Sequence, residues 1–183
     1  MKSSDTTLLI VPGWQGSDAD HWQSRWESRL PTARRVEQAD FARPDRAAWT
    51  TALGAAVAAA EKPVVVVAHS LGVPTLVHAV PDLPPGKVAG AFLVAPPDLD
   101  AAPLNPLFSS FAPVPRAPLP FPSVVVASRN DAYCSYAHAQ ELAAAWGAEL
   151  LDAGEAGHIN PAAGFGPWPE GSMRLLGFLR SLG

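Results

Sequence analysis

A run of four valines, Val64 to Val67, limits the fold of this chain more than any other feature of the sequence. Pro63 precedes the run, and proline is tolerated at the first residue of a strand. An unbroken run of β-branched residues is typical of a parallel strand that is buried on both faces. We therefore predict a central strand over residues 64–68, in a sheet that carries helices on both sides.

Similar short apolar segments alternate along the chain with longer segments that favour helices. The other strands are predicted over 8–11, 35–38, 88–94, 124–127 and 149–151. Helices are predicted from Asp18 or Asp20 to about Leu30, and over 44–60, 70–80, 136–146 and 170–182. This alternation predicts a parallel sheet, and right-handed crossovers leave few topologies. We expect one domain over 1–183, a three-layer α/β/α sandwich with a mostly parallel six-stranded sheet of order 2-1-3-4-5-6.

Three residues that suit acyl-transfer chemistry each follow a predicted strand. They are Ser70, Asp131 and His158, in the chain order expected of an α/β-hydrolase. Ligands of such sheets bind at the carboxyl ends of the strands, so the three side chains should meet at one edge. Ser70 lies in the stretch "AHSLG", where a strand that turns sharply into a helix would expose the hydroxyl. We predict a catalytic triad with Ser70 as nucleophile, His158 as base and Asp131 as the acid that orients it.

The same logic predicts an oxyanion hole. One donor should be the N–H of Leu71, directly after the nucleophile, and the other the N–H of Trp14 in the loop after the first strand. Gly13 allows the backbone a close approach that a side chain would block. His69 is expected to pack beside the site, and we group it with Gly13 and Trp14 as candidate substrate-binding residues.

Simpler interpretations stay open for several of these residues. Ser70 could be a helix cap, and Asp131 could merely close a turn. Asp98, at the end of the fourth strand, is a rival for the acid, and His158 could be a structural loop histidine. Structural roles are the main expectation for a further set: His78, His138, Trp22, Trp26, Trp168 and Cys134.

The composition limits the classes of partner. Hydrophobic residues make up 48% and charged residues 16%, as in globular proteins. The formal net charge of −4 argues against nucleic acid as the main partner, and no run of about 18 apolar residues suggests a membrane span. The single cysteine favours a cytoplasmic protein. The five scattered histidines suggest no metal site, and we expect no cofactor.

The segment from Pro96 to Pro122 holds nine prolines and cannot form a regular helix. We expect a loop or flap over the top of the sheet. Four apolar side chains in it could line one side of a shallow groove: Leu104, Leu107, Phe108 and Phe111.

The sequence resembles the small serine hydrolases related to retinoblastoma-binding protein 9 and to YdeN-like bacterial proteins, within the α/β-hydrolase superfamily. The resemblance rests on "VPGWQGSDADHWQSRWE", "AHSLG", "SRNDAYCSY" and "GHIN…GFGPWPEG", which together span residues 11 to 172. It implies a compact hydrolase without a lid, with Ser70, Asp131 and His158 in the family's catalytic positions. Ala68 departs from the general GxSxG pattern, which has glycine there.

The expected function is hydrolysis of a small-molecule ester, thioester or amide through an acyl-enzyme on Ser70. A protein-binding module that keeps the hydrolase fold with little turnover is the alternative, and an acyltransferase is a third. We expect a monomer or a weak homodimer.

Overall fold

The computed structural model describes residues 1–101 and 106–183. Its sheet has six strands in the order β2-β1-β3-β4-β5-β6, and every neighbouring pair is parallel. The strands are β1 (Thr7–Val11), β2 (Ala33–Arg35), β3 (Val64–His69), β4 (Val88–Val94), β5 (Ser123–Ala127) and β6 (Glu149–Asp152). The helices are α1 (Trp22–Arg29), α2 (Arg46–Ala59), α3 (Gly72–Ala79), α4 (Tyr136–Trp146) and α5 (Pro169–Ser181).

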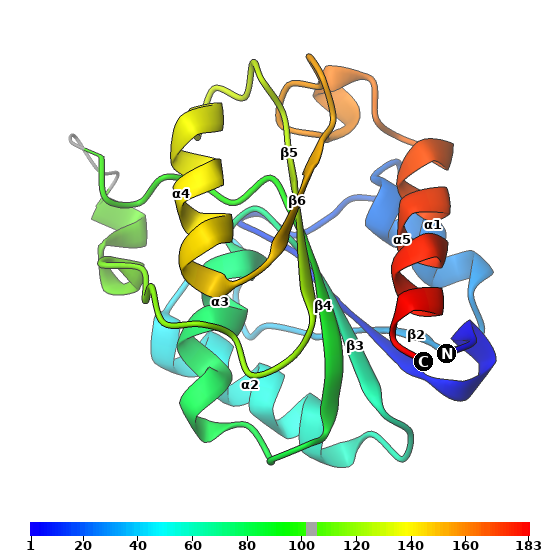
Figure 1. The fold of residues 1–183 in the computed structure, drawn as a ribbon. Coiled ribbons are helices and arrows are strands. Elements are labelled where there is room, and N and C mark those ends of the chain that lie inside the picture. Colours follow the sequence, from blue (N-terminus) through cyan, green and yellow to red (C-terminus); the bar gives the residue numbers. More distant parts are fainter. Residues whose placement is uncertain (102–105) are drawn as a thin grey trace.

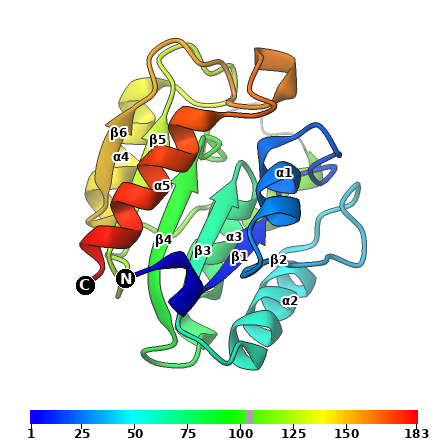
Figure 2. The same cartoon turned by 90° about the vertical axis from the view of Figure 1, so that its right-hand side faces the viewer.

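Helices cover both faces of the sheet and make three layers. Figure 1 shows α2, α3 and α4 on one side of the strands and α1 with α5 on the other, and Figure 2 shows the second layer from the front. Side chains of β3 alternate between the two cores: Val64 and Val66 face α2, α3 and α4, and Val65 and Val67 face α1 and α5. The four valines are fully buried, and each contributes about 1.5–3 kcal/mol by that burial. The predicted three-layer fold and strand order are confirmed.

Several predicted boundaries were wrong for local reasons. The second strand covers 33–35 and not 35–38, because Pro12 lacks an N–H and ends β1, and the β1–β2 pairing with it. Helix α1 begins at Trp22 with His21 as its cap, because Asp18 instead accepts hydrogen bonds from the N–H groups of Asp20 and His21.

The proline-rich segment has no α-helix among its described residues, but it contains a short 3-10 helix over Pro106–Phe111. Phe111 and Val114 are buried against the layer of α2, α3 and α4, and the indole N–H of Trp146 donates to the carbonyl of Pro115. The segment therefore packs on one side of the molecule and does not lie wholly over the sheet. No described helix is long and apolar enough to cross a membrane.

Candidate active site

The turn from β3 into α3 holds Ser70 in an unusual backbone conformation. Ser70 has φ +52°, which lies in the left-handed region, so α3 cannot begin at Ser70 as predicted and instead begins at Gly72. The N–H of Ser70 donates to the carbonyl of Val94 at 3.0 Å and ties the turn to β4. Such a conformation costs about 1–3 kcal/mol and persists only where the surroundings enforce it.

Two glycines let other backbone segments approach this turn. A Cβ on Gly72 would lie 2.3 Å from the carbonyl oxygen of Val11, so the start of α3 packs directly on the end of β1. A Cβ on Gly13 would lie 2.8 Å from the Cβ of Ser70 and 3.1 Å from the nitrogen of Leu71. The loop after β1 therefore passes immediately beside the serine, as the sequence predicted.

The amides predicted for the oxyanion hole lie on these two segments. Leu71 caps α3, and Trp14 follows Gly13 in the wall of the pocket. Within residues 1–101 and 106–183, neither N–H has a hydrogen-bond acceptor. Both N–H groups belong to segments that border Ser70, which suits them to bind an oxygen that becomes negatively charged there.

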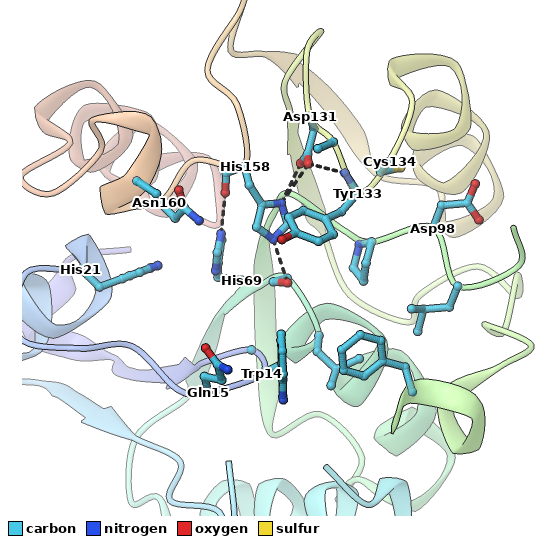
Figure 3. Close-up of a pocket in the computed structure, with 18 of the residues that line it drawn as sticks. Trp14, Gln15, His21, His69, Asp98, Asp131, Tyr133, Cys134, His158 and Asn160 are labelled. Atoms are coloured by element: carbon cyan, nitrogen blue, oxygen red, sulfur yellow. Dashed lines mark hydrogen bonds and ion pairs between the residues drawn. The ribbon is translucent and has the colours of Figure 1, made fainter. Parts of the chain in front are cut away.

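The structure brings Ser70, His158 and Asp131 into one hydrogen-bonded row (Figure 3). Nδ1 of His158 lies 2.9 and 3.0 Å from the two carboxylate oxygens of Asp131. A carboxylate accepts, so Nδ1 carries the proton and Nε2 accepts from the Ser70 hydroxyl at 2.9 Å. The Asp131 side chain is 2% exposed and that of His158 12%, which keeps most water from these bonds.

Asp98, the rival acid, makes different contacts. Its Oδ1 accepts from the N–H groups of Asp100 and Ala101 and lies 3.4 Å from Nε2 of His138. In Figure 3 its carboxylate points away from His158. The geometry thus pairs His158 with Asp131 and pairs Asp98 with His138.

His69 lines the pocket, but its ring is engaged elsewhere. Nε2 lies 2.9 Å from the carbonyl oxygen of His158, and a carbonyl only accepts, so Nε2 must carry the proton. Burial, followed by the nearby His158 and His21, lowers the pKa of His69 well below its usual value. His69 is therefore neutral near pH 7 and holds the backbone of His158, a contact that differs from the predicted substrate-binding role.

The loop that carries His158 is held by several further side chains that sequence reasoning missed. Trp22 donates its indole N–H to the carbonyl of Ile159 at 2.9 Å. The side chain of Asn130 accepts from the N–H of Gly157 at 2.7 Å, and the hydroxyl of Ser128 accepts from the N–H of Ala156 at 2.9 Å. Ser128 and Asn130 lie between β5 and Asp131, and their polar side chains next to Asp131 in the sequence were the available signal.

The "GPWPEG" stretch packs against Trp22, one of the side chains that hold the His158 loop. Trp168 is buried against Trp22, Trp26 and Phe92. A Cβ on Gly171 would lie 2.2 Å from the Trp168 ring, so only glycine leaves room for this indole. Trp22, Trp26 and Trp168 are buried in the core and do not face the pocket.

A pocket of about 810 Å³ opens around Ser70. Trp14, which is 37% exposed, and Phe108 form part of its wall, with ring centroids 5.5 Å apart. The other groove predictions fare differently. Phe111 is fully buried and does not line the pocket, Leu107 is 43% exposed outside it, and Leu104 lies outside the described residues.

Cys134 also lines the pocket, but it is poorly suited to be a nucleophile. Burial, together with the negative charges of Asp98 and Asp131, raises the pKa of its thiol to about 12. The thiol thus stays protonated at neutral pH, and the thiolate is the reactive form. Across the described residues, no group of three or more His, Cys, Asp or Glu side chains is placed to hold a metal ion.

The sequence pattern of the family described as serine hydrolase matches residues 8–176. The chain belongs to this serine hydrolase family. A YdeN-like hydrolase from Pectobacterium atrosepticum is 38% identical, with a TM-score of 0.87 over 98% of this chain and 94% of that one. No curated protein matches the chain significantly.

More distant solved structures share the fold alone. The ydeN gene product of B. subtilis is 20% identical, with a TM-score of 0.75 over 97% of this chain and 98% of that one. Esterase 2 of Thermogutta terrifontis is 16% identical, with a TM-score of 0.70 over 100% of this chain and 86% of that one. The family match and the 38% identical structure place the chain among the YdeN-like hydrolases of the α/β-hydrolase superfamily.

Proposed function

We propose that this serine hydrolase cleaves a small carboxylic ester, thioester or amide through an acyl-enzyme on Ser70. The observation that carries the proposal is the continuous row of hydrogen bonds from Ser70 through His158 to Asp131, each 2.9–3.0 Å long. A serine hydroxyl becomes an effective nucleophile only when a positioned base takes its proton. The row supplies that base together with the group that orients it.

The proposed reaction has two halves. Nε2 of His158 takes the Ser70 proton as Oγ attacks the carbonyl carbon, and the N–H groups of Leu71 and Trp14 bind the oxyanion. His158 then gives the proton to the leaving group, and the carbon–heteroatom bond breaks. In the second half water attacks the acyl-enzyme with His158 as base, which releases the acid. Asp131 keeps the proton on Nδ1 throughout.

The acyl group of the substrate is proposed to be short. Trp14, Leu99 and Phe108 offer apolar surface in the wall of the pocket around Ser70, and each methylene adds about 0.8 kcal/mol only while it stays buried. We expect kcat/KM on p-nitrophenyl esters to be highest at roughly C2 to C6. A steady increase to C12 and beyond would require a deep acyl channel and would contradict this part of the proposal.

Labelling with a fluorophosphonate tests the nucleophile directly. Intact-mass analysis should show one adduct on the wild type and none on Ser70→Ala, with circular dichroism to confirm that the variant is folded. An unlabelled wild type would favour the protein-binding alternative. Labelling that survives the substitution would place the nucleophile elsewhere.

A further inference from the structure

We propose that Tyr133 is the contact surface for the leaving group, and that the preferred substrates carry an aromatic ring on the alcohol, thiol or amine that departs. This inference rests on the proposed acyl-enzyme function and adds the substrate class to it. It concerns the side of the pocket next to His158, whereas the acyl group is assigned to the wall of Trp14 and Phe108.

Tyr133 is a large side chain in an unusual place. It is 58% exposed although it lines the pocket, and its ring centroid lies 4.5 Å from that of His158, with 53° between the ring planes. Figure 3 shows the ring beside the imidazole, close to the row that joins Ser70 to Asp131. An exposed aromatic ring leaves apolar surface in contact with water, and a substrate that packs on the ring would remove that surface from water.

The backbone of Tyr133 is fixed on both sides. Its N–H donates to Oδ1 of Asp131 at 2.9 Å, and its carbonyl accepts from the N–H of Asp98 at 2.9 Å. The Asp131 carboxylate, which is bonded to His158, thus also fixes the backbone that carries the Tyr133 ring. A surface held in this way binds a ligand with less loss of conformational entropy than a mobile side chain would.

The chemistry of the reaction places the leaving group against this ring. Nε2 of His158 must come within about 2.6–3.2 Å of the departing heteroatom to protonate it. The imidazole has two aromatic neighbours in the described pocket, His69 and Tyr133. His69 is 5% exposed and bonded to the His158 carbonyl, which leaves the Tyr133 side for the leaving group.

The test separates the leaving group from the acyl group. One series keeps the acetyl group and varies the alcohol: ethyl, cyclohexylmethyl and benzyl acetate, whose alcohols are similarly basic, followed by pH-stat titration. A second series keeps p-nitrophenol and varies the acyl chain from acetate to hexanoate. Because kcat/KM reports steps up to formation of the acyl-enzyme, it is the quantity to compare.

Tyr133→Ala should lower kcat/KM for benzyl acetate by about tenfold, since an aromatic contact and its buried area are lost. The loss should be smaller for cyclohexylmethyl acetate and less than about twofold for ethyl acetate. Tyr133→Phe should restore the benzyl preference, because the ring and not the hydroxyl carries it. Tyr133→Ala should also lower kcat/KM for the p-nitrophenyl series by one common factor at every acyl length. Met173→Ala, on the exposed face of α5, is the matched control and should change neither series.

Three results would overturn the inference. An equal loss for all three acetates would mean that Tyr133 only shields the imidazole from water. A loss that grows with acyl length would place Tyr133 on the acyl side, and no loss for any of the three acetates would mean that it does not contact substrate. In each case a wild type that still hydrolyses esters and is labelled at Ser70 leaves the proposed function standing. If the wild type is neither labelled nor active, the proposed function fails first.

Discussion

The turn that carries Ser70 and the loop that carries His158 are held in different ways. The turn is short, with Ser70 at φ +52°. It is fixed by two backbone contacts: the hydrogen bond from the N–H of Ser70 to the carbonyl of Val94, and the close approach of Gly72 to β1. The loop after β6 is longer and is fixed by side chains from elsewhere in the chain, including Trp22 and His69.

This difference separates what the fold enforces from what single side chains adjust. A change in the turn must displace strands and should therefore affect stability. A change among the side chains that hold the loop can move the imidazole by a fraction of an ångström, and it should affect turnover more than folding. The predictions below test this division, beginning with the largest effect.

Asp131→Asn should reduce kcat by about 10⁴-fold with little change in stability, because the amide no longer fixes the Nδ1–H tautomer of His158. Steady-state kinetics on a p-nitrophenyl ester and urea unfolding measure the two effects. Asp98→Asn is the matched control in the same pocket and should have little effect on kcat. A severe loss of kcat in Asp98→Asn with a mild one in Asp131→Asn would assign the role of the acid to Asp98.

Gly72→Ala should destabilise the fold by about 3 kcal/mol or more, because the new Cβ would lie 2.3 Å from the backbone oxygen of Val11. Gly54→Ala in α2 is the control, since no described atom beyond its chain neighbours and the nearby backbone of its own helix lies within 4 Å of the added Cβ. That variant should gain about 1 kcal/mol from helix propensity. Urea unfolding of both variants decides the matter, and a Gly72→Ala protein as stable as the wild type would show that the turn is not fixed by this approach.

His69→Leu should lower kcat by about 10- to 100-fold with a smaller change in KM, because the carbonyl of His158 loses its donor and the imidazole shifts. His69→Gln should recover most of the loss, since a glutamine amide can donate from a position near that of Nε2. A residue that served packing alone would show the opposite order, with the apolar leucine retaining more activity than glutamine.

The sequence was informative wherever one local rule decided the outcome. Continuous apolar runs located the buried strands β1, β3, β4 and β5, and polar residues in the segments that follow β3, β5 and β6 located Ser70, Asp131 and His158. It failed where contacts between distant segments decided. Nothing in the sequence shows that the ring of His69 reaches a carbonyl 89 residues later, or that Phe111 turns into the core while Phe108 faces the pocket. The cap of α1 was missed because Asp18 is engaged in its own turn, which leaves His21 to accept from Gln23.

His21→Asn should make the protein less sensitive to mild acid. Burial lowers the pKa of His21 from 6.5 to about 4, so the unfolded chain takes up a proton at this residue before the folded one does. The contribution of His21 to the free energy of unfolding is therefore complete above pH 6.5, falls as the pH drops, and levels off near pH 4. At pH 5 the loss from His21 is about 2 kcal/mol.

Asparagine can still accept from the N–H of Gln23 as a helix cap but does not titrate. The difference in unfolding free energy between pH 7 and pH 5, measured in urea, should shrink by about 2 kcal/mol in the variant. Between pH 7 and 8 the two proteins should respond alike, because His21 is then neutral whether the chain is folded or not. An unchanged acid response would show that the buried His21 does not contribute to it, and His69, whose pKa is lowered in the same direction, would be the next residue to replace.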